Sequence, residues 1–104
     1  MARAVVGGRG ARGIVICGTG VGSAIAANKV KGVRAGLCHD TFSARHAHLH
    51  NDTNVLALGA CVIGPGLAKD IVVAWLDAPF EGGRHARRVE EIRQIEEREP
   101  GPSG

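Results

Sequence analysis

The sequence contains very few aromatic residues: one tryptophan, two phenylalanines and no tyrosine among 104 residues. Proteins that bind nucleic acid by base stacking need aromatic side chains beside basic ones, so this scarcity argues against a nucleic-acid partner. The net charge of +3 is explained equally well by a small anionic ligand. The core must be built from Val, Ile, Leu and Ala, which dominate the 44% of hydrophobic residues.

Long apolar runs and paired cysteines are also missing. No segment approaches the roughly 20 apolar residues that span a bilayer, and the first residues lack the apolar centre of a signal peptide. The three cysteines, Cys17, Cys38 and Cys61, form no Cys-x-x-Cys pair. An odd, scattered set predicts free thiols in a reducing compartment rather than a disulfide framework or structural zinc site. We therefore expect a cytoplasmic protein with no membrane partner.

The chain is short enough to form one domain over residues 1–104, with an irregular lead-in over 1–12 and a frayed tail over 100–104. Between them, short apolar runs alternate with helical patterns, which predicts an α/β fold: a three-layer α/β/α, Rossmann-like parallel sheet. Ligands of such sheets bind beyond the carboxyl ends of the strands. The strands are expected over 13–17, 33–38 and 54–60, and the helices over about 22–30, 43–49, 65–78 and 84–99. In the last helix, Val89, Ile92 and Ile95 form a predicted inward stripe.

A glycine-rich turn follows the first predicted strand, with Cys17 before it and glycines at 18, 20 and 22. Backbone N–H groups at the start of the next helix lack intrahelical partners, so they attract an anion. The same position favours ionisation of the Cys17 thiol, and a thiolate can act as base or nucleophile. Two alternatives stay open at this point: a dinucleotide-binding turn in which Ser23 replaces the third glycine, and a turn that only packs strand on helix.

Three histidines, His46, His48 and His50, lie on the second predicted helix. At i, i+4 spacing His46 and His50 share a face while His48 points elsewhere, so at most two could bind one metal ion. With no obvious third ligand we expect no metal site. The alternatives are surface histidines or, at the helix end, a proton-transfer group.

Two arginines, Arg84 and Arg88, lie four residues apart at the start of the last predicted helix. Both guanidinium groups can reach one oxyanion. The alternative is a solvated helix face on which Glu90 and Glu91 are the partners.

Three motifs together resemble one family: 17–22 (Cys-Gly-Thr-Gly-Val-Gly), 50–56 (His-Asn-Asp-Thr-Asn-Val-Leu) and 80–89 (Phe-Glu-Gly-Gly-Arg-His-Ala-Arg-Arg-Val). In order and spacing they resemble the type B ribose-5-phosphate isomerases, a family that also contains galactose-6-phosphate and allose-6-phosphate isomerases. The resemblance implies reversible conversion of ribose 5-phosphate to ribulose 5-phosphate through a cis-enediolate, without metal or organic cofactor. Five- and six-carbon sugar phosphates share the reacting end, so the preferred sugar stays open.

The resemblance also assigns roles to individual residues. Cys17 would be the base that moves a proton between C2 and C1, Thr19 would assist at the sugar oxygens, and His50 would open the furanose ring. The enediolate oxyanion would be bound by the amides of Gly18, Gly20, Val21 and Gly22. Asn51 would contact the sugar, and Arg84 and Arg88 would bind the phosphate.

The resemblance further implies a five-stranded parallel sheet and a homodimer with shared active sites. On this comparison the chain begins just before the family's third strand, without the front strand that carries an Asp-His pair. Cys61 stands where relatives commonly have an arginine, so one phosphate contact is expected to be absent. The alternative to an isomerase is therefore a truncated, non-catalytic chain that binds sugar phosphates or associates with a partner; a nucleotide-binding module is the third option.

Overall fold

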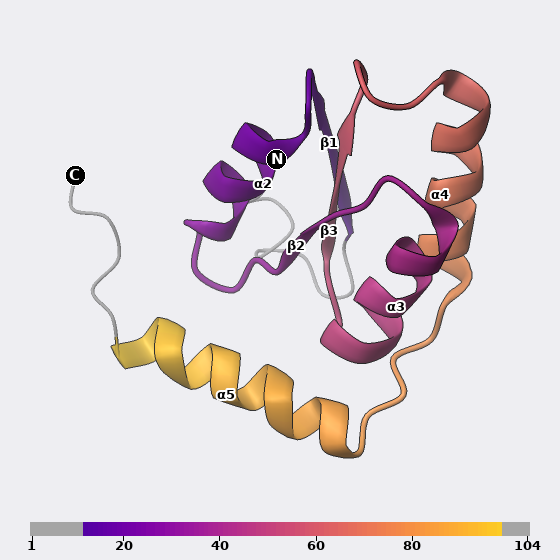
Figure 1. Cartoon of the computed structure of the whole chain (residues 1–104). Helices are drawn as coiled ribbons and strands as arrows, with labels where there is room; N and C mark the ends of the chain where they lie inside the picture. The colour runs from indigo at the N-terminus through magenta and orange to yellow at the C-terminus, as the bar shows by residue number, and fades with distance from the viewer. Residues whose placement is uncertain (1–11, 99–104) are drawn as a thin grey trace.

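The computed structural model describes residues 12–98 and shows three strands and four helices that alternate along most of the chain (Figure 1). The predicted elements are confirmed in type and order, although the strand expected over 33–38 contains only three residues. Expectations for residues 1–11 and 99–104 lie outside the described part. The elements are β1 (Gly13–Cys17), α2 (Val21–Asn28), β2 (Ala35–Leu37), α3 (Thr41–Asn51), β3 (Val55–Gly59), α4 (Pro65–Asp77) and α5 (Arg84–Arg98).

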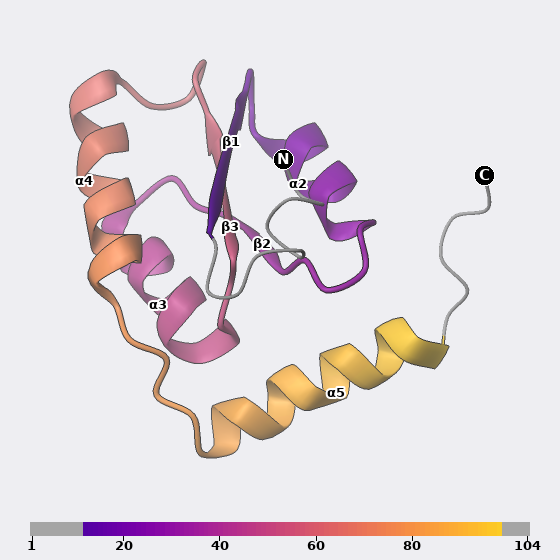
Figure 2. The same ribbon diagram turned by 180° about the vertical axis from the view of Figure 1, so that it is seen from behind.

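The three strands form one parallel sheet in the order β1-β3-β2. Gly13 pairs with Val55 and Cys17 with Gly59, so β1 and β3 start and end together. Every residue of the central strand β3 is buried, which explains its uninterrupted apolar sequence. Helix α2 covers one face of the sheet, and α3 and α4 cover the other (Figures 1 and 2). The predicted three-layer α/β/α arrangement is confirmed.

Two buried clusters hold the layers together, one on each face of the sheet. Trp75 and Ile71 of α4 pack with Leu56 of β3 on one face, while Ala27 of α2 packs with Val55 on the other. The Trp75 indole N–H also donates a hydrogen bond of 2.8 Å to the Thr53 hydroxyl oxygen. Because residues of β3 face both clusters, this strand fixes the positions of the helices on either side.

Helix α5 differs from the prediction in its burial. The prediction that an apolar stripe of α5 faces inward is wrong for a single chain: no residue of α5 is buried, and Ile92 and Ile95 are 43% and 53% exposed. The reason is its position, because α5 runs along the lower end of the molecule rather than over a face of the sheet (Figure 1). Near its end, the Glu96 carboxylate accepts a hydrogen bond of 2.6 Å from the Gly32 amide.

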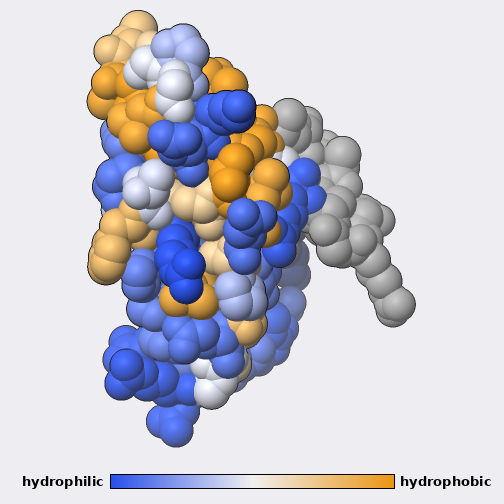
Figure 3. All heavy atoms as spheres, turned by 90° about the vertical axis from the view of Figure 1, so that its right-hand side faces the viewer, coloured by the Kyte–Doolittle hydropathy of each residue, from blue (hydrophilic) through white to orange (hydrophobic). Residues whose placement is uncertain are grey.

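The two ends of the molecule differ in polarity. On the face that Figure 3 presents, apolar side chains gather over the upper part, where the strands finish, and hydrophilic side chains cover most of the lower part. Exposed apolar residues of α4 and the loop before it include Val62, Leu67 and Val73. Within residues 12–98, no helix has both the length and the apolar composition that a membrane crossing requires.

Candidate functional site

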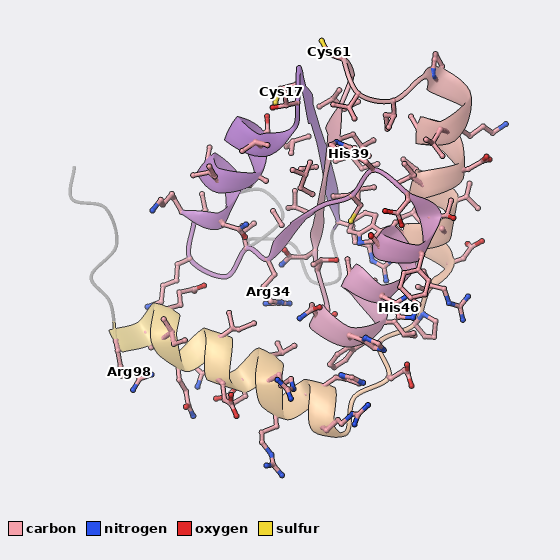
Figure 4. The ribbon with its side chains drawn as sticks, in the orientation of Figure 1. Cys17, Arg34, His39, His46, Cys61 and Arg98 are labelled. Carbon is pink, nitrogen blue, oxygen red and sulfur yellow. The ribbon has the colours of Figure 1, made fainter. Side chains whose placement is uncertain are left out.

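Cys17 lies at the junction between β1 and α2, where the glycine-rich turn holds its sulfur against backbone amides. The Gly20 amide donates a hydrogen bond of 3.2 Å to the Cys17 Sγ, and the Val21 amide approaches the Thr19 hydroxyl at 3.4 Å. Gly20, the residue before α2, has φ +82°, and no side chain caps the helix. First-turn N–H groups of α2 are therefore directed toward the position where an oxyanion could bind. Figure 4 shows Cys17 at this upper end of the sheet.

Hydrogen bonds from this turn change the acidity of the Cys17 thiol. The Ser23 hydroxyl and then the Ser23 amide lower the pKa of Cys17. Burial raises this pKa by less than either Ser23 hydrogen bond lowers it, and the Gly20 and Thr19 amides add still smaller lowering effects. Cys38 shows the opposite case, because burial, with the nearby Asp40 carboxylate, raises its pKa to about 11. Cys17 thus ionises more readily than an ordinary thiol. The sequence indicated this direction, but Ser23 was considered only as an imperfect third glycine.

Replacing Gly20 by alanine is expected to destabilise the protein and disturb the amides around Cys17. A left-handed backbone costs a non-glycine residue about 1–2 kcal/mol, and the added Cβ would lie 2.5 Å from the Leu37 Cδ1 and 2.9 Å from the Leu58 carbonyl carbon. Urea unfolding measures the loss. Gly22→Ala is the matched control, since a Cβ there meets nothing within 4 Å; an equal loss of stability in both variants would contradict this account.

A second group of predicted site residues lies where α3 ends and α5 begins. The Glu81 amide donates a hydrogen bond of 3.1 Å to the Leu49 carbonyl, which ties the α4–α5 connection to α3. This contact brings the start of α5 beside the last turn of α3. The resulting hollow has a volume of about 410 Å³ and is lined by His50, Asn51, Arg84, His85 and Arg88. All four residues that the sequence analysis assigned to ring opening, sugar contact and phosphate binding therefore line one hollow.

The ring of His50 is held between two other histidines. It stacks on His85 with ring centroids 4.0 Å apart and planes 10° apart, and it meets the edge of His46 at 4.8 Å. The Glu81 carboxylate lies 3.5 Å from the His50 Nε2. The potential metal-ligating atoms of His50, Glu81 and His85 all lie within 4.8 Å of one another. The sequence analysis missed Glu81 and His85 as neighbours of His50, although both lie in the third motif.

His48 has a structural role. Its ring is buried, and its Nδ1 lies 3.1 Å from the Thr53 carbonyl, to which it can donate. The expectation that His46 and His50 share a face while His48 points elsewhere is confirmed.

Within one chain the two groups of predicted site residues lie at opposite ends of the sheet. Cys17 ends β1, whereas His50 and Asn51 close α3 just before β3 begins. A five-residue strand spans roughly 13 Å at about 3.3 Å per residue, so the two ends are at least that far apart. The ligand-binding residues were expected at the carboxyl ends of the strands. His50, Asn51, Arg84 and Arg88 do not lie there, because α3 runs back along the sheet and α5 is attached to the far end of the sheet (Figure 1).

Two further residues lie near Cys17. The exposed Cys61 is fixed by its amide, which donates 2.8 Å to the Gly18 carbonyl. The His39 Nε2 is buried and has no hydrogen-bond partner among residues 12–98. It points toward Gly59, where an added Cβ would lie 3.0 Å away. The sequence analysis did not select His39, although it follows β2 at the same end of the sheet where Cys17 follows β1.

Comparison with known proteins identifies the family of this chain. A family model described as Ribose/Galactose Isomerase matches residues 1–92. The chain belongs to this family. It is 58% identical over 98 residues to ribose-5-phosphate isomerase B of Escherichia coli (strain K12), covering 94% of the chain and 66% of that protein. It is 56% identical over 99 residues to D-erythrulose-4-phosphate isomerase of Pectobacterium atrosepticum, covering 95% and 65%.

Solved structures of isomerase-family members have the same fold. Ribose-5-phosphate isomerase B of Clostridium thermocellum superposes with a TM-score of 0.90 at 57% identity, over 92% of this chain and 65% of that one. The Mycoplasma genitalium ribose-5-phosphate isomerase B, solved with bound ribulose-5-phosphate, gives a TM-score of 0.83 at 45% identity, over 85% and 58%. The chain thus spans just under two thirds of the length of these relatives.

Proposed function

We propose that this isomerase-family chain interconverts ribose 5-phosphate and ribulose 5-phosphate. The observation that carries the proposal is the Cys17 sulfur, which accepts a hydrogen bond from the Gly20 amide beside the start of α2. Support also comes from the relatives, among which the E. coli protein is named ribose-5-phosphate isomerase B. The family also contains galactose isomerases, so a six-carbon sugar phosphate is an alternative substrate.

In the proposed reaction the Cys17 thiolate removes the hydrogen from C2 of the open-chain aldose. The electron pair of that C–H bond forms the C1–C2 double bond of a cis-enediolate, and the carbonyl oxygen becomes an oxyanion. The Cys17 thiol then returns the proton to C1, while Thr19 assists proton movement between the two sugar oxygens. Backbone amides stabilise the oxyanion without having to reorganise, and they belong to Gly18, Gly20, Val21 and Gly22.

The second group of residues prepares and holds the substrate. His50 would transfer the proton that opens the furanose ring, with Asn51 contacting the sugar beside it. Arg84 and Arg88 would bind the phosphate, because two guanidinium groups one helical turn apart can share its oxygens. The hollow of about 410 Å³ that these residues line is open enough for such a ligand.

A homodimer with shared active sites would reconcile the two groups. Cys17 and His50 lie at opposite ends of one chain, so a second copy would have to bring its His50 end to the Cys17 end of the first. In an isologous dimer the same contact occurs twice, which gives two equivalent sites. The exposed Ile92 and Ile95 of α5 provide apolar surface that such an assembly could cover.

The alternative is a chain that binds sugar phosphates without turning them over. An assay of ribulose 5-phosphate formation separates the two functions. Steady turnover that depends on Cys17 supports the isomerase, whereas saturable ribose 5-phosphate binding without turnover supports the alternative.

Arg84→Ala is expected to raise KM for ribose 5-phosphate roughly 10- to 100-fold with kcat little changed, because a charged hydrogen bond to the phosphate contributes about 1.5–3 kcal/mol. Initial rates over a range of substrate concentrations measure both constants. The matched control is Arg87→Ala, since Arg87 does not line the His50 hollow. An unchanged KM in Arg84→Ala, or an equal rise in both variants, would remove Arg84 from the phosphate site.

A further inference from the structure

We propose that His50, Glu81 and His85 form a binding site for a divalent transition-metal ion such as Zn²⁺ or Ni²⁺. Their ligand atoms already lie within 4.8 Å of one another. Two imidazoles and one carboxylate are a ligand set that proteins use for zinc with a position left open for another ligand. This site is distinct in chemistry from the phosphate contacts of Arg84 and Arg88, although it shares their hollow.

The three ligands come from three separate parts of the chain that the fold holds together. His50 lies in the last turn of α3, Glu81 in the α4–α5 connection and His85 in the first turn of α5. The hydrogen bond of 3.1 Å from the Glu81 amide to the Leu49 carbonyl fixes the connection beside His50. Because all three positions are anchored, an ion would not have to order a flexible segment on binding.

The remaining change needed is small. With metal–ligand bonds of about 2.0–2.2 Å, the donor atoms must move closer by on the order of 1 Å. The rings of His50 and His85 are stacked at 4.0 Å, so one ring has to turn for both nitrogens to face the same point. Both side chains are only half-buried, which leaves room for this rotation.

The charges around the site act in both directions. Arg84 and Arg88 line the same hollow and repel a cation, whereas the Glu81 carboxylate attracts it.

An ion on His50 would occupy the nitrogen that ring opening requires. The site would therefore inhibit the enzyme reversibly. This consequence rests on the proposed isomerase function, but binding of the ion does not.

Calorimetric titration of the full chain with Ni²⁺ alone tests the site. Cys17 and Cys61 are first changed to serine, so that their thiols cannot bind the ion. We expect one ion per chain, and at least a tenfold loss of affinity in both His85→Gln and Glu81→Gln, because even residues behind the ligands contribute 10–100-fold. His46→Gln is the control: its Nδ1 is hydrogen-bonded to the Phe42 carbonyl rather than to a ligand, so this variant should lose clearly less affinity than the two ligand variants. Circular dichroism checks that each variant is folded.

The proposal is overturned if no saturable Ni²⁺ binding occurs, if His85→Gln and Glu81→Gln both bind as tightly as the parent, or if His46→Gln weakens binding as much as they do. An isomerase assay of the chain with its cysteines intact keeps the two proposals apart. Ni²⁺ binding without any turnover would support the metal site and contradict the proposed function. Turnover without Ni²⁺ binding would support the proposed function and contradict the metal site.

Discussion

Cys17→Ala is expected to lower kcat for ribose 5-phosphate isomerisation by about 10²–10⁴-fold, the usual contribution of a positioned general base. KM should change little, because the substitution leaves the proposed phosphate ligands Arg84 and Arg88 in place. Initial rates of ribulose 5-phosphate formation measure both. The control is Cys61→Ser, which removes the exposed thiol of Cys61, a residue to which the proposed reaction gives no part in proton transfer. Full turnover in Cys17→Ala would exclude Cys17 as the base.

The acidity of Cys17 gives this prediction a second readout. Because hydrogen bonds from Ser23 and the turn amides lower its pKa, half of the Cys17 thiol should be ionised at a lower pH than in free cysteine. Both kcat/KM and the rate of iodoacetamide alkylation should rise with pH, each with a midpoint below that of free cysteine alkylated under the same conditions. Ser23→Ala should shift both midpoints upward. Cys38, whose pKa is raised to about 11 by burial and Asp40, should stay unmodified over the same range. A Cys17 midpoint at or above that of free cysteine would contradict the account.

Local sequence patterns predicted the elements near Cys17 well. The apolar residues within 54–60 predicted a strand, and β3 forms there and is buried throughout. Asp40 lies directly before α3, and its carboxylate accepts a hydrogen bond of 2.6 Å from the Ser43 amide. These features depend on residues close together in the chain, which is why they can be read without the fold.

Features that depend on tertiary structure were predicted less well. Helical periodicity placed Ile92 and Ile95 on one face of α5, but it cannot say whether anything covers that face. The approach of Glu81 and His85 to His50 depends on how the α4–α5 connection returns to α3. One signal was available and not used: a crossover helix between parallel strands runs opposite to them. His50, near the end of such a helix, therefore had to lie at the amino ends of the strands, away from Cys17.

The central claim is that a complete site combines the Cys17 end of one chain with the His50 end of another. Two inactive variants, Cys17→Ala and His50→Ala, test it when they are unfolded together in equal amounts and refolded. Random pairing makes about half of the dimers mixed, and in an isologous dimer each mixed pair has one intact site and one site with both changes. About a quarter of all sites are then intact, so about a quarter of the parent activity should return.

Two variants from the same end provide the control. His50→Ala refolded with Arg84→Ala should recover no activity beyond the sum of the two separate variants, because every site in the mixed dimer still lacks one residue. The decisive measurement is the turnover of the refolded Cys17→Ala and His50→Ala mixture against refolded parent protein. Recovery to about one quarter agrees with shared sites. Activity no higher than that of the two variants refolded separately would contradict them.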